Sequence, residues 1–98
     1  IANENIKFYT QKNLAINTFF LKEKKSVVLK ESFFNNSKEV VFRSFTEIIK
    51  IVGKKYYPSR GKKIDRIIES INNKDFLKTT LGGCLIKKVN QTVIVTKE

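Results

Sequence analysis

The segment SKEVVFRSFTEIIKIVG, residues 37–53, is the strongest structural signal in this 98-residue chain. Its large apolar residues recur at i, i+4, i+7, i+8 and i+11, which is the period of one helix face: they are Val41, Phe45, Ile48, Ile49 and Val52. We expect Asn36 to cap this helix, with Glu39 as the second half of a capping box. We expect Gly53 to end it as a left-handed residue.

A second one-sided helix is predicted after Pro58, with Ser59 as its cap and the pair at 72–73 as its end. Its apolar stripe consists of Ile64, Ile67, Ile68 and Ile71. Helices this short gain most of their stability from packing, so both must lie on another layer.

That layer is predicted to be a β-sheet. Apolar runs flank the turn-compatible pair Asn90-Gln91 and indicate a C-terminal hairpin. Residues 15–21 and 26–29 are typical of two further strands around a charged turn at 22–25, and a short helix is predicted over residues 3–13. We therefore expect an α+β fold, with two short amphipathic helices packed on a small antiparallel β-sheet that includes a C-terminal hairpin.

Composition excludes several classes of function. The chain has no His, which removes Ser-His-Asp and Cys-His catalysis and the common Cys/His metal sites. Cys84 is the single cysteine, so no internal disulfide can form. No apolar run approaches the length of a membrane helix, and we expect no membrane partner. We predict no catalytic residue and no metal ligand in the chain, and no cofactor.

The length and the absence of Met suggest a single domain, residues 1–98, cut from a larger protein. The 20 Lys and Arg residues outnumber 9 Asp and Glu residues, for a net charge of +11. A positive field of this size attracts polyanions, with nucleic acid ahead of an anionic membrane surface. Because 17 of the 20 are Lys, AT-rich codon usage is an alternative source of the excess.

The segment between the two helices concentrates five basic residues around Tyr56 and Tyr57. Basic groups neutralise phosphates, and Tyr stacks on unpaired bases, although either Tyr could instead fill the gap between the helices. Ser59 and the free N–H groups after it would favour a phosphate. The candidate binding residues are Lys54, Lys55, Tyr57, Arg60, Lys62, Lys63 and Arg66.

Other charged and small residues have a structural interpretation. Arg43 is expected to pair with Glu39 one turn earlier. Gly82-Gly83 leads into a strand rather than a helix, so it predicts a turn or bulge and not a phosphate loop, and Cys84 is expected to be buried. Only one of Lys87 and Lys88 can share a sheet face with Leu85 and Val89, and a solvated sheet rim is as good an interpretation as a binding role.

Three features follow one another from about residue 37 to the end: a capped helix with Val-Val-Phe-Arg at 40–43, Tyr-Pro-x-Arg at 57–60 and Leu-Gly-Gly-Cys at 81–84. Their order resembles the C-terminal region of bacterial tRNA(Ile)-lysidine synthetases, of the N-type ATP pyrophosphatase (PP-loop) family. The resemblance covers about two thirds of the chain.

The resemblance implies a parent ligase that uses ATP and magnesium to join lysine to the wobble cytidine of an isoleucine tRNA. That chemistry belongs to an N-terminal domain with a Ser-Gly-Gly-x-Asp-Ser loop, which this sequence lacks. For this chain the resemblance implies a non-catalytic, accessory tRNA-binding domain in the cytoplasm. Its expected partners are tRNA, its own catalytic domain and a second copy in a homodimer.

Three alternatives stay open. The chain could be a structural domain that docks on the catalytic domain or a second subunit, with an exposed apolar patch among Phe19, Phe20, Phe33 and Phe34. It could be a general nucleic-acid module that binds DNA and RNA alike. A stand-alone enzyme ranks last, because neither a His nor a recognisable nucleophile or phosphate loop is present.

Overall fold

A computed structural model of the chain describes residues 2–21, 23, 25–54, 61–73 and 78–98. The elements follow in the order α1 (Ala2–Ile16), β1 (Thr18–Leu21), β2 (Ser26–Leu29), the 3₁₀ turn η1 (Glu31–Asn35), α2 (Lys38–Gly53), α3 (Gly61–Ile71), β3 (Lys78–Leu81), β4 (Cys84–Val89) and β5 (Thr92–Lys97). The strands form one antiparallel sheet in the order β1-β2-β5-β4-β3. The predicted α+β fold and its C-terminal hairpin, β4–β5, are confirmed.

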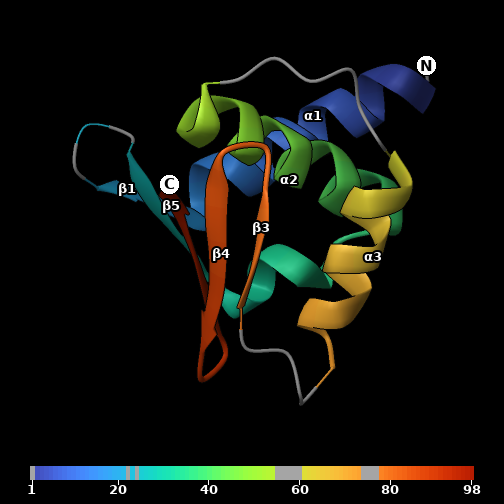
Figure 1. Cartoon of the computed structure of the whole chain (residues 1–98). Helices are drawn as coiled ribbons and strands as arrows, with labels where there is room; N and C mark the ends of the chain where they lie inside the picture. The colour runs from blue at the N-terminus through green and yellow to red at the C-terminus, as the bar shows by residue number, and fades with distance from the viewer. Residues whose placement is uncertain (1, 22, 24, 55–60, 74–77) are drawn as a thin grey trace.

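The helices gather on one side of the sheet, and the β1–β2 hairpin extends away from them (Figure 1). Because side chains alternate along a strand, each strand presents one set of residues to the helices and the other set to the opposite face. The apolar and cysteine side chains that meet the helices are fully buried on the three central strands: Val27, Leu29, Cys84, Ile86, Val93 and Val95. We call this the inner face, and the opposite side the outer face.

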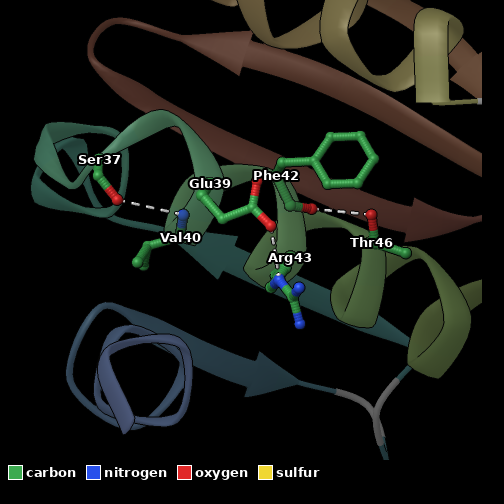
Figure 2. Close-up of polar contacts among 6 residues, drawn as sticks. All are labelled: Ser37, Glu39, Val40, Phe42, Arg43 and Thr46. Carbon is green, nitrogen blue, oxygen red and sulfur yellow. Dashed lines mark hydrogen bonds and ion pairs between the residues drawn. The ribbon is translucent and has the colours of Figure 1, made fainter. Parts of the chain in front are cut away.

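The N-terminus of α2 lies one residue later than expected. Ser37 is the cap, and its Oγ accepts a hydrogen bond from the Val40 amide at 3.4 Å (Figure 2). Asn36 instead donates its side-chain amide to the Phe33 carbonyl at 3.3 Å. The third helical residue is therefore Val40, so the predicted capping box was wrong. Glu39 accepts from Arg43 Nε at 2.9 Å, which confirms the predicted ion pair.

The C-terminus of α2 also differs from the prediction. Gly53 is the last helical residue, and the left-handed position is taken by Lys54, with φ 56° and its amide bonded to the Lys50 carbonyl. Gly53 serves packing instead, because a Cβ there would lie 2.1 Å from the Gly82 carbonyl oxygen and 3.1 Å from Cys84 Sγ. The absence of a side chain lets the end of α2 touch the turn between β3 and β4.

A buried amide joins α1 to the rest of the core. The side-chain nitrogen of Asn13 donates to the Phe33 carbonyl at 3.2 Å and to Ser44 Oγ at 3.1 Å. Its two partners belong to η1 and α2, so one polar side chain ties three elements together. In the described parts of the chain, no helix combines the length and the apolar character needed to cross a membrane.

Candidate nucleic-acid interface

Helix α3 is held on the core by its isoleucine stripe and by one lysine. Ile64 and Ile71 are buried in the hydrophobic core, as the sequence predicts. Lys88 points to the same inner face and donates its Nζ to the Ile71 carbonyl at 2.7 Å. A cation at the end of a helix also suits the negative end of the helix dipole. Lys88 is therefore a structural residue, and not a solvated sheet rim.

The solvent side of α3 carries Lys62, Lys63 and Arg66, all exposed. The first turn contains no acidic residue, so two cations lie at the positive end of the helix dipole, which costs about 0.3–1 kcal/mol each. Within the described residues, none of the three side chains forms an ion pair. Asp65 and Glu69 lie exposed on the same helix and lower its net charge. A bound anion at the start of α3 would relieve the remaining repulsion.

Lys54 lies apart from this group. It is exposed in the left-handed position that follows α2. In Figure 1 the C-terminal end of α2 is on the left of the view and the first turn of α3 is on the right. The structure thus brings Lys62, Lys63 and Arg66 together on α3 and does not bring Lys54 to them. The other three candidates, Lys55, Tyr57 and Arg60, lie outside the described residues.

The exposed side of α2 offers little free charge. Arg43 pairs with Glu39 at 2.9 Å, and Lys50 pairs with Glu47 at 3.6 Å. Both pairs are about half exposed, and pairs of this kind contribute little to stability, about 0–1 kcal/mol. Their effect is to neutralise the middle of the helix, so that the unpaired positive charge lies elsewhere.

A second basic group lies on the sheet, and sequence reasoning missed half of it. The β3–β4 register places Lys78 directly opposite Lys87 on the outer face. Within the described residues, no strand of the sheet contains an Asp or a Glu. The pair could have been found by counting outward from Gly82-Gly83, because a two-residue hairpin turn determines the register of both strands. The prediction that only one of Lys87 and Lys88 shares a sheet face with Leu85 and Val89 is confirmed, and that residue is Lys87, on the outer face.

The Leu-Gly-Gly-Cys segment builds a turn, as predicted. Gly82 and Gly83 have φ of 59° and 81° and join β3 to β4. Cys84 is fully buried, and its Sγ donates to the Ile49 carbonyl at 3.6 Å. Burial, with a smaller contribution from the nearby Glu98 charge, raises the pKa of the thiol to about 11, although a backbone hydrogen bond from Gly53 opposes the shift. The thiol therefore stays protonated at neutral pH and does not act as a nucleophile.

We compared the chain with family models, with curated proteins and with solved structures, and none of them matches it.

Proposed function

We propose that this chain is an accessory tRNA-binding domain of a tRNA(Ile)-lysidine synthetase. The observation that carries the proposal is the exposed group Lys62, Lys63 and Arg66, which has no ion-pair partner among the described residues of a chain with net charge +11. Lysine and arginine contacts to phosphate supply affinity and orientation without reading sequence. This is what a domain needs if it holds the body of a tRNA while another domain acts on the anticodon.

In this proposal the chemistry belongs to the catalytic domain of the parent enzyme, in the cytoplasm. The family resemblance implies that ATP and magnesium bind there. The Gly82-Gly83 turn of this chain joins two strands and does not open a helix as a phosphate loop does. The proposal is also supported by the family resemblance, which rests on the motifs Val-Val-Phe-Arg, Tyr-Pro-x-Arg and Leu-Gly-Gly-Cys. Leu-Gly-Gly-Cys has a packing role here, since Gly82 meets the end of α2 at Gly53 and Cys84 is buried beside them.

The test is a binding titration of the 98-residue chain with isoleucine tRNA and with a DNA duplex of similar charge, at low and physiological salt. We expect a preference for the tRNA that survives at physiological salt. Lys62→Glu combined with Lys63→Glu should weaken tRNA binding and flatten its salt dependence, because each lost phosphate contact lowers the slope of log K against log salt by about 0.9.

The matched control is Lys7→Glu combined with Lys12→Glu, which makes the same charge change at exposed positions of α1. If both double variants weaken binding equally, the effect is one of net charge and the assignment to α3 is wrong. Equal binding of tRNA and DNA that vanishes with salt would indicate a bare polycation, and the tRNA-binding proposal would fail.

A docking domain is the second candidate, and exposed apolar residues favour it. Phe19 and Phe20 on β1 are exposed, as that hypothesis predicts, whereas Phe33 is fully buried and Phe34 packs beside it in the core, so half of the predicted patch was wrong. Sedimentation of the isolated chain separates the two functions. Self-association that Phe20→Ser abolishes, without any change in tRNA affinity, would favour docking.

A further inference from the structure

One row of residues crosses the whole outer face of the sheet. The strand registers pair Phe19 with Val28, Val28 with Ile94, Ile94 with Lys87 and Lys87 with Lys78. Directly paired residues point to the same side of a sheet, so these five side chains form a continuous line, which we call the outer row. It spans four strand spacings, about 19 Å. The register alone creates it, because its members are up to 75 positions apart in the sequence.

The two ends of the outer row differ in chemistry from its middle. Phe19, at one end, is 58% exposed, and Lys30 Nζ lies 5.0 Å from the centre of its ring. Lys87 and Lys78, at the other end, are both exposed. The middle consists of the half-buried aliphatic side chains of Val28 and Ile94. The row thus offers an aromatic ring with a cation over one of its faces, then an apolar strip and then two more cations.

The lysine pair indicates an anionic partner. Like charges at directly opposite strand positions destabilise a sheet, and none of the described strand residues supplies a carboxylate to offset them. The exposed ring and the aliphatic strip indicate that this partner also presents flat apolar groups. An unpaired nucleic-acid strand has both, since its phosphates suit the lysines and its bases stack on aromatic rings. A duplex presents mainly its phosphates, because its bases are already stacked.

We propose that the outer row binds a single-stranded segment of RNA, with Phe19 stacking on a base and with Lys78 and Lys87 contacting phosphates. This inference rests on the proposed tRNA-binding function and assigns the unpaired part of the RNA to the sheet. Lys62, Lys63 and Arg66 on α3 then contact the phosphates of the tRNA body. The two surfaces belong to different elements, so they can be tested separately.

The probe is a fluorescently labelled single-stranded RNA of mixed sequence and roughly ten nucleotides, titrated with the 98-residue chain and compared with a duplex RNA of equal length. Phe19→Ala should weaken single-strand binding about tenfold, because it removes one ring on which a base stacks, and should leave duplex binding unchanged. Lys78→Gln combined with Lys87→Gln should lower the slope of log K against log salt by about 1.4, from two phosphate contacts at about 0.7 each.

The chain supplies matched controls. Phe8 on α1 is 59% exposed, so Phe8→Ala removes an equally accessible ring from another surface. Lys7→Gln combined with Lys12→Gln removes the same charge as the sheet variant. Equal single-strand affinities for Phe19→Ala and Phe8→Ala would overturn the proposal. So would a loss of self-association in Phe19→Ala with RNA binding intact, which would make this face a protein interface.

A measurement on the unmutated chain removes any dependence on how the variants fold. Adding the single-stranded RNA should shift amide resonances along the outer row, and shifts confined to α3 would refute the assignment. Binding of tRNA that depends on Lys62 and Lys63 but not on Phe19 would overturn this inference and leave the proposed function standing. Single-strand binding that depends on Phe19, without a preference for tRNA over DNA, would support the inference and overturn the proposed function.

Discussion

Replacing Gly53 with Ala tests the contact that joins α2 to the β3–β4 turn. Two opposing effects follow from the structure. Ala favours a helix interior over Gly by about 1 kcal/mol. The added methyl group would lie 2.1 Å from the Gly82 carbonyl oxygen, and this obstacle is backbone rather than a side chain that can rotate away. Overpacking of this kind costs roughly 1–3 kcal/mol, and a contact this short belongs at the upper end of that range.

The expected net loss for Gly53→Ala is about 2 kcal/mol in the free energy of unfolding. For a domain of this size that lowers Tm by about 10 °C, since 1 kcal/mol corresponds to roughly 4–8 °C. Thermal and urea denaturation followed by circular dichroism would measure it. Ser70→Ala, at an exposed position of α3, is the control for a helix substitution without a steric conflict. An unchanged or higher Tm for Gly53→Ala would refute the close approach of α2 and the turn.

Two further predictions concern single residues. Lys88→Met should lower the free energy of unfolding by roughly 1.5–3 kcal/mol, because it removes a charged hydrogen bond to the Ile71 carbonyl. Lys87→Met should change the free energy of unfolding by no more than about 0.5 kcal/mol. Equal losses of the two variants in urea denaturation would contradict the placement of Lys88 on the inner face and Lys87 on the outer face. The raised pKa of Cys84 means that the unfolded chain releases its thiol proton first, near the ordinary value of 9.0. The contribution of Cys84 to stability is therefore full below pH 9 and is lost between pH 9 and about 11. Urea denaturation across that pH range should show the free energy of unfolding falling less in Cys84→Ala than in the unmutated chain. Parallel plots of this free energy against pH for the two proteins would refute the raised pKa of Cys84.

Local patterns predicted most of the secondary structure. The apolar stripe of α2 and the glycine pair at 82–83 are signals within a few residues of one another, and both are confirmed. The errors at the two ends of α2 were also local. Asn36 and Ser37 both suit a cap, and the Phe33 carbonyl decides between them by engaging Asn36. Gly53 suits a left-handed position, but packing against Gly82 uses its small size instead.

Only part of the candidate site could be predicted from the sequence. The basic segment at 53–63 predicted the lysines at the start of α3, because clustered charge is visible in one stretch of chain. The sequence could not show that Lys54 lies apart from the lysines of α3, since that depends on how α2 and α3 are placed relative to each other. The sequence also could not show that Phe33 is buried while Phe19 is exposed, because the residues next to each Phe in the sequence do not distinguish the two rings.

By itself the sequence determined the net charge of +11, the helical periods, the hairpin turns and the exclusion of histidine chemistry. Tertiary structure alone decided that Lys88 supports α3, that Lys87 faces outward and that Phe19, Val28 and Ile94 continue its row. The physical reason is the range of the interactions. Helix period and turn geometry arise within a few residues, whereas the outer row depends on the pairing of strands from both ends of the chain, which the packed core selects.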